Sequence, residues 1–99
     1  KAPAVNDGMR HVFNQFVIRC VKRDELQKFL NDSGVGTAIY YPLPLHLQKC
    51  FSGLGYREGD FPESEKAARE TLAIPVFPDI TRAEQEEVVG RIADFYGKL

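Results

Sequence analysis

Several features that mark specialised classes of protein are missing from this chain of 99 residues, which has no tryptophan, one methionine and two cysteines. No apolar run approaches the roughly 20 residues that a membrane-spanning helix needs. The first twenty residues lack the basic start and the apolar stretch of a signal peptide. A net charge of −1 gives no general attraction to nucleic acid or to anionic lipid. We therefore expect a soluble, cytoplasmic, single-domain protein that binds neither nucleic acid nor membrane.

The motifs of familiar catalytic and metal sites are missing too. The chain has neither a G-x-x-x-x-G-K-[ST] loop nor a G-x-G-x-x-G loop, and no serine stands in a nucleophile elbow. Cys20 and Cys50 lie far apart without a C-x-x-C pair, which favours two reduced thiols, although a disulfide between them stays open. His11 and His46 are too distant in sequence to suggest a metal pair. The sequence predicts no metal site.

Hydrophobic periodicity and turn residues predict the order β-α-β-loop-α-β-α. The expected elements are a strand at 11–21, a helix at 23–33, a strand at 36–41, a loop at 51–60, a helix from about 62, a strand at 71–76 and a helix after a capping box at 81–84. Apolar residues on both faces of 11–21 indicate a strand that is central or at least well covered, whereas Pro75 indicates an edge strand or a bulge at 71–76. The predicted class is α+β, with a small sheet and helices on one face.

The ends of the chain differ in character. Residues 1–10 are polar and interrupted by Pro3 and Gly8, so we predict a connector or loop there. The domain is therefore expected to comprise residues 11–99.

Residues 40–48 are the segment most suited to binding. A strand ends in Tyr40 and Tyr41, and two prolines then hold the backbone on a stiff path. In an extended stretch, His46 and Gln48 would point the same way. Phenol, imidazole and amide groups can hydrogen-bond hydroxyls and phosphates, and the rings can stack on a base or a sugar. The residues alone leave two interpretations open: a rigid binding loop, or a strand stopped by prolines with an ordinary polar surface.

Five pieces of the sequence, in order, carry a family resemblance. They are HVFNQFVIR at 11–19, RDEL at 23–26, GVGTAIYYPLPLHLQ at 34–48, GDFP at 59–62 followed by Glu65, and LAIPVFP at 72–78 followed by Thr81 and the final helix. Together they resemble the small domain of the DegT/DnrJ/StrS-type sugar aminotransferases. The resemblance covers roughly residues 9–96.

The resemblance implies the small C-terminal domain of a fold-type-I, pyridoxal-phosphate-dependent enzyme, built on a largely antiparallel sheet. A large domain, absent from this chain, carries the cofactor lysine in such enzymes. They move an amino group, usually from glutamate, to a nucleotide-linked keto-sugar for antibiotic sugars or cell-surface polysaccharides, and they work as homodimers. None of the six lysines here has a recognisable cofactor setting. We therefore expect no catalytic and no cofactor-binding residue in this chain, and no activity from it alone.

The resemblance also directs four side chains toward the nucleotide-sugar substrate: Tyr40, Tyr41, His46 and Gln48. Tyr41 matches a position that is usually tyrosine in the family, whereas histidine is commoner at the positions of Tyr40 and Asn14. The departure at Tyr40 counts against a proton-handling role there, but stacking and hydrogen bonding remain available. An alternative function is a stand-alone, non-catalytic binding or interaction domain with the same fold.

Overall fold

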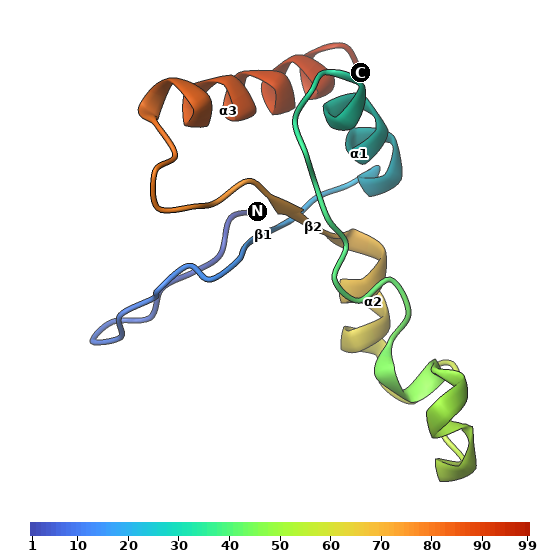
Figure 1. Cartoon of the computed structure of the whole chain (residues 1–99). Coiled ribbons are helices and arrows are strands. Elements are labelled where there is room, and N and C mark those ends of the chain that lie inside the picture. The colour runs from blue at the N-terminus through green and yellow to red at the C-terminus, as the bar shows by residue number, and fades with distance from the viewer.

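The computed structural model describes residues 1–99 and shows a small sheet beneath two helices, with a third helix leading away from the sheet (Figure 1). The elements are β1 (Phe16–Arg19), α1 (Arg23–Asp32), the 3-10 segments η1 (Leu45–Leu47) and η2 (Lys49–Leu54), α2 (Pro62–Glu70), β2 (Thr71–Ile74) and α3 (Arg82–Gly97). None of the helices is long and apolar enough to cross a membrane. Helices with a small antiparallel sheet confirm the predicted α+β class.

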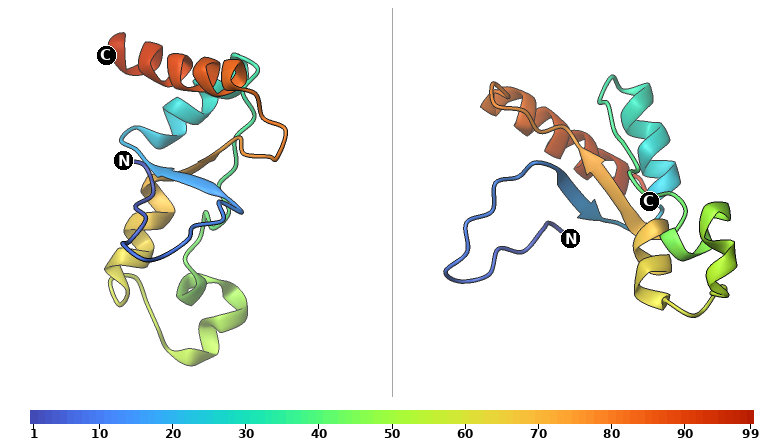
Figure 2. Two further views of the ribbon diagram at one scale, coloured as in Figure 1. Left: turned by 90° about the vertical axis from the view of Figure 1, so that its left-hand side faces the viewer. Right: turned by 60° about the horizontal axis from the view of Figure 1, so that its bottom comes forward.

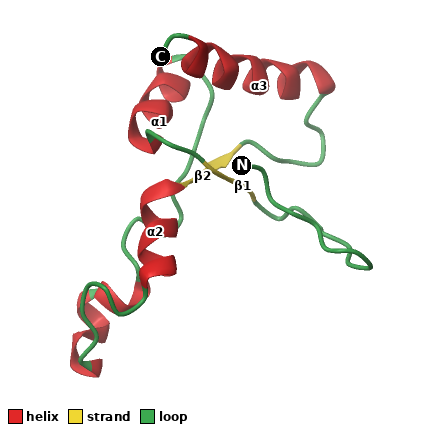
Figure 3. Ribbon diagram, turned by 180° about the vertical axis from the view of Figure 1, so that it is seen from behind, coloured by secondary structure: helices red, strands yellow, loops and turns green.

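The sheet is shorter than the sequence predicts. β1 pairs antiparallel with β2, from Phe16 opposite Ile74 to Arg19 opposite Thr71. On the other edge of β2, a single bridge joins Ala73 to Ala38, with N–H···O distances of 3.1 and 2.8 Å. β2 is therefore the central strand and β1 lies at an edge, so the central position expected for 11–21 is wrong. The strands expected at 11–21 and 36–41 shrink to four residues and one bridge, and Figure 3 shows how small the strand region is.

The length of β2 explains this difference. The strand follows directly on α2, which ends at Glu70, and it stops before Pro75, which has no N–H to donate. It therefore offers only four residues to its neighbours, however well their own sequences suit a strand.

The core lies between the sheet and the helices α1 and α3. Leu26 and Leu30, one turn apart on α1, are fully buried together with Leu72 of β2, and Val35 and Val88 complete the cluster. Figure 2 shows both helices on this side of the sheet. Only 10 of the 99 residues are buried, so few side chains carry the stability of the chain.

The helix boundaries follow local sequence. α1 ends before Gly34, whose φ of 82° suits a residue without a side chain. At the start of α3, the Thr81 hydroxyl accepts from the Glu84 N–H, and the Thr81 N–H donates to the Glu84 carboxylate at 2.7 Å. The predicted capping box is confirmed.

The segment between Ala38 and β2 forms an arm that projects from the sheet, at the lower right of Figure 1. It contains η1, η2 and α2, so the predicted loop at 51–60 is helical in its first part. At the other end of the chain, residues 1–15 contain no helix or strand and loop out beside β1. The Arg19 N–H donates to the Lys1 carbonyl at 2.9 Å, which returns this loop to the free edge of β1.

Candidate functional site

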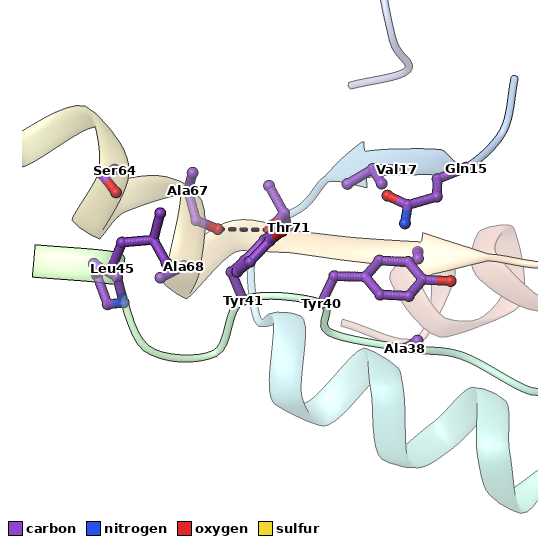
Figure 4. A pocket seen from close by; sticks show the side chains of 12 residues that line it. Gln15, Val17, Ala38, Tyr40, Tyr41, Leu45, Ser64, Ala67, Ala68 and Thr71 are labelled. Carbon is purple, nitrogen blue, oxygen red and sulfur yellow. Dashed lines mark hydrogen bonds between the residues drawn. The ribbon is translucent and has the colours of Figure 1, made fainter. Parts of the chain in front are cut away.

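A pocket of about 250 Å³ lies on the face of the sheet opposite α1 and α3. Leu72 belongs to the core, and since side chains alternate along a strand, its neighbour Ala73 and the paired Val17 face the other side. We call this cavity the tyrosine pocket. It lies between the sheet, the start of the 40–48 loop and α2 (Figure 4). Its lining residues are Gln15, Val17, Ala38, Tyr40, Tyr41, Pro44, Leu45, Ser64, Ala67, Ala68, Thr71 and Ala73.

The two predicted tyrosines both line this pocket and remain open to ligands. Tyr40 is 53% exposed and Tyr41 is 65% exposed. The polar residues beside them are Gln15, Ser64 and Thr71, which the sequence interpretation did not select. Gln15 stands two positions before Val17, so strand alternation could have placed it on the same face. Because no charged side chain lines the pocket, it can select a ligand by stacking and hydrogen bonding rather than by charge.

His46 lies elsewhere, because the loop is not extended at this point. The Leu47 N–H donates to the Pro44 carbonyl at 3.0 Å and the Gln48 N–H to the Leu45 carbonyl at 3.1 Å, which closes a 3-10 turn. The stretch after Pro44 is therefore turned rather than extended, so the expectation that His46 and Gln48 point the same way, which holds for an extended stretch, is wrong. The turn buries the His46 side chain, which is 7% exposed and stands edge-on to Phe61 with ring centroids 4.9 Å apart.

Gln48 is not part of the tyrosine pocket either. Its side-chain amide donates to the Leu43 carbonyl at 3.4 Å, within its own loop. The structure thus brings Tyr40 and Tyr41 together and separates His46 and Gln48 from them. Contact of these two residues with a substrate stays a prediction.

Glu65, in the first turns of α2, is the buried partner of His46 that sequence reasoning missed. Its Oε1 atom lies 2.9 Å from His46 Nε2 and accepts from the Gly59 N–H at 2.8 Å. Burial raises the pKa of Glu65, but hydrogen bonds from the Gly59 backbone, the His46 ring and the Phe61 backbone outweigh it and hold the pKa below the ordinary 4.5. The signal that the sequence offered was a glutamate six residues after Gly59 and three after Pro62, a proline that fits the first turn of a helix.

The residues present do not fit a covalent cofactor site. All six lysines are exposed, and none of them lines the tyrosine pocket. No group of three or more His, Cys, Asp or Glu side chains is placed to hold a metal ion. Cys20 and Cys50 are both free thiols, as expected. The side chains that line the tyrosine pocket can offer aromatic contact and neutral hydrogen-bonding groups.

Comparisons with known proteins agree with the resemblance. A sequence model described as the DegT/DnrJ/EryC1/StrS aminotransferase family matches residues 1–93. The chain is 55% identical over 94 residues to a "pleiotropic regulatory protein" of Geobacillus stearothermophilus, covering 95% of this chain and 25% of that protein. It is 37% identical over 87 residues to the dTDP-3-amino-3,6-dideoxy-alpha-D-galactopyranose transaminase of Aneurinibacillus thermoaerophilus, covering 88% and 23%.

A solved structure matches the fold over almost the whole chain. It is the crystal structure of DesV from S. venezuelae in complex with a ketimine intermediate, with a TM-score of 0.90 and 30% sequence identity. The match covers 95% of this chain and 25% of DesV, so the chain spans about a quarter of the proteins it resembles. The extent of the family match, the sequence identities and the shared fold show that this chain belongs to the DegT/DnrJ/EryC1/StrS aminotransferase family.

Proposed function

We propose that residues 11–99 are the small C-terminal domain of an aminotransferase that moves an amino group from glutamate to a nucleotide-linked keto-sugar, with residues 1–10 as a connector. Relatives named as transaminases of dTDP- and UDP-linked sugars support the reaction. Coverage of only about a quarter of those proteins supports a larger parent. The observation that carries this chain's own role is the uncharged pocket with two exposed tyrosines.

Tyr40 and Tyr41 are the proposed substrate contacts. Their rings can stack on a sugar or a base, and their hydroxyls can hydrogen-bond sugar hydroxyls. Since no cation lines the pocket, the diphosphate of a nucleotide-sugar would be bound by another part of the enzyme. The pocket therefore suits the sugar end of the substrate.

The remaining parts of the active site would come from outside this chain. We propose that a large domain binds pyridoxal phosphate, whose chemistry is to stabilise the carbanion formed at the reacting carbon, and that the enzyme is a homodimer. Large apolar side chains that lie open on this chain, such as Val21 at 71% and Val89 at 63% exposed, are consistent with cover by another domain.

The first test uses the full-length protein. We expect it to show the absorbance band of bound pyridoxal phosphate and to aminate a nucleotide-linked keto-sugar with glutamate as donor. A full-length protein that binds no cofactor would refute the proposed reaction.

The second test addresses the tyrosines. Tyr41→Ala should raise the KM for the sugar substrate about tenfold, because a stacking ring and a hydrogen bond are lost together. Tyr56→Ala is the matched control, since Tyr56 is also about half exposed but lies outside the tyrosine pocket. Equal KM values for the two variants would contradict the proposed contact.

A second candidate function is a non-catalytic, ligand-binding regulatory protein with the same fold. The name of the 55% identical relative, a pleiotropic regulatory protein, favours it. The same assays separate the two candidates. A regulator would bind nucleotide-sugars in calorimetric titrations, and Tyr41→Ala would weaken that binding. It would not aminate any of them.

A further inference from the structure

The buried pair His46–Glu65 joins two walls of the tyrosine pocket. His46 belongs to the 40–48 loop, which contributes Tyr40 and Tyr41 to one wall. Glu65 belongs to α2, whose Ser64 forms part of the facing wall. The hydrogen bond between their side chains is therefore a strut that connects the loop to the helix across the end of the pocket.

The strut is buried and directional. The side chains of His46 and Glu65 are 7% and 8% exposed. The low pKa of Glu65 keeps its carboxylate ionised, so it can only accept hydrogen bonds. The proton in the 2.9 Å contact must therefore sit on His46 Nε2, which fixes the orientation of the imidazole ring.

The carboxylate also anchors the backbone on its own side. Its Oε1 atom accepts from the Gly59 N–H, where φ is +94°, a conformation that suits glycine. The Phe61 ring packs edge-on against His46. Glu65 thus orders both the turn that precedes α2 and the loop that faces it.

The other end of the 40–48 loop has an anchor of its own. Ala38 bridges to Ala73 of β2, two residues before Tyr40. The two tyrosines therefore lie between one backbone anchor at Ala38 and one side-chain anchor at His46. Pro42 and Pro44 stiffen the segment between these anchors, so a shift of His46 is passed to the tyrosines rather than absorbed along the way.

We propose that Glu65 is a positioning residue, which, by holding His46, fixes the 40–48 loop against α2 and so sets the shape of the sugar-side pocket. The inference rests on the proposed function for its kinetic consequence, but its structural part stands without any activity. Glu65 does not touch the substrate; it acts through Tyr40 and Tyr41.

The kinetic test compares variants of the full-length enzyme at Glu65, at its partner His46 and at a control position. Glu65→Ala should raise the KM for the nucleotide-sugar about tenfold, because a small misplacement of binding groups has large effects on a bound substrate. The kcat and the KM for glutamate should change by less than about twofold, because the proposal gives this pocket a role only in binding the sugar substrate. Glu65→Gln, which keeps an acceptor oxygen for His46 or Gly59, should restore most of the affinity.

Glu63→Ala is the matched control, because Glu63 lies in the same turn of α2, is exposed and takes part in no ion pair of the structure. In a double-mutant cycle, His46→Phe combined with Glu65→Ala should raise the KM no more than the stronger single change, because the two residues act as one unit. The proposal would be overturned if Glu65→Ala has the same kinetic constants as Glu63→Ala. It would also be overturned if Glu65→Ala lowers kcat and raises both KM values together.

A second measurement needs no turnover and separates this proposal from the proposed function. In full-length protein labelled with ¹⁵N-histidine and ¹⁵N-tyrosine, His46 should show a proton on Nε2, and Glu65→Ala should remove that signature and shift the Tyr40 and Tyr41 amide signals. Glu63→Ala should leave them in place. Unmoved tyrosine signals would refute the positioning role even in an active enzyme. If the wild-type enzyme is inactive but Glu65→Ala still shifts the tyrosine signals, only the proposed aminotransferase reaction is refuted.

Discussion

The replacement Leu72→Ala tests whether the small core carries the stability of this chain. Leu72 is fully buried in the centre of β2 and belongs to a cluster of only five buried side chains. Removing three carbons at about 0.8 kcal/mol each gives a loss of about 2.4 kcal/mol, and the cavity left behind brings it to about 3–4 kcal/mol. For so small a core we expect a free energy of unfolding of about 5 kcal/mol, the lower end of the usual range. The replacement should therefore remove more than half of the stability.

The measurement is urea unfolding followed by far-ultraviolet circular dichroism, because the chain has no tryptophan to report on the core. The midpoint should fall with little change in slope, and the melting temperature should drop by about 15 °C or more. Leu54→Ala is the control, since it makes the same chemical change at a side chain that is 65% exposed, and it should alter stability by less than about 0.5 kcal/mol. If the two variants differ by less than about 1 kcal/mol, the cluster around Leu72 is not the core that holds the chain together.

Three further predictions follow from local contacts. Thr81→Ala should destabilise α3 by about 1 kcal/mol in the same urea assay, with Thr81→Ser close to wild type, because the hydroxyl caps the helix. The pKa values of Glu65 and Glu84 both lie below 4.5, so their contribution to the free energy of unfolding is complete above pH 4.5 and is lost as the pH falls through their lower folded values. Glu65→Gln and Glu84→Gln should therefore make the free energy of unfolding fall less steeply with acid, and an unchanged pH dependence would contradict the low pKa values. Iodoacetamide should label the exposed Cys50 before Cys20, whose thiol pKa is raised by burial, and peptide mass spectrometry showing equal rates would contradict this order.

The helices could be predicted because their signals are local. The capping box at Thr81 and Glu84 is complete within four residues, and the spacing of Leu26 and Leu30 defines the buried side of α1 without reference to anything else. The start of α2 at Pro62 follows from the fit of proline to a first helical turn.

The strands could not be predicted to the same extent, because a strand depends on its partner. Residues 11–21 have the composition of a central strand, but only Phe16–Arg19 find a partner, since β2 ends at Ile74, just before Pro75. The length of β2 is set by α2 and by that proline, and neither feature lies near β1 in the sequence. The short length of β1 therefore could not be predicted from residues 11–21 alone.

The candidate site divides in the same way. The resemblance directed Tyr40 and Tyr41 toward a binding site, and both side chains line the tyrosine pocket, while their contact with a substrate stays a prediction. The error at His46 arose from Pro44, because the φ of proline fits an extended chain and the entry to a 3-10 turn equally well. In the turn that forms, the buried imidazole has a partner, Glu65, that lies nineteen residues further along the chain.

The cost of burying this pair is an argument for its role in positioning. A polar group removed from water loses free energy unless its hydrogen bonds are remade, and two apolar side chains would fill the space between the loop and α2 without that requirement. Apolar contact, however, is non-directional and would let the loop slide along the helix, whereas the bond from His46 Nε2 to Glu65 Oε1 permits one register. Under the proposed function, Tyr40 and Tyr41 bind by stacking and hydrogen bonding, which requires that the pocket wall keep a fixed geometry. The buried histidine of the 40–48 loop is therefore best explained by what it does for the two exposed tyrosines.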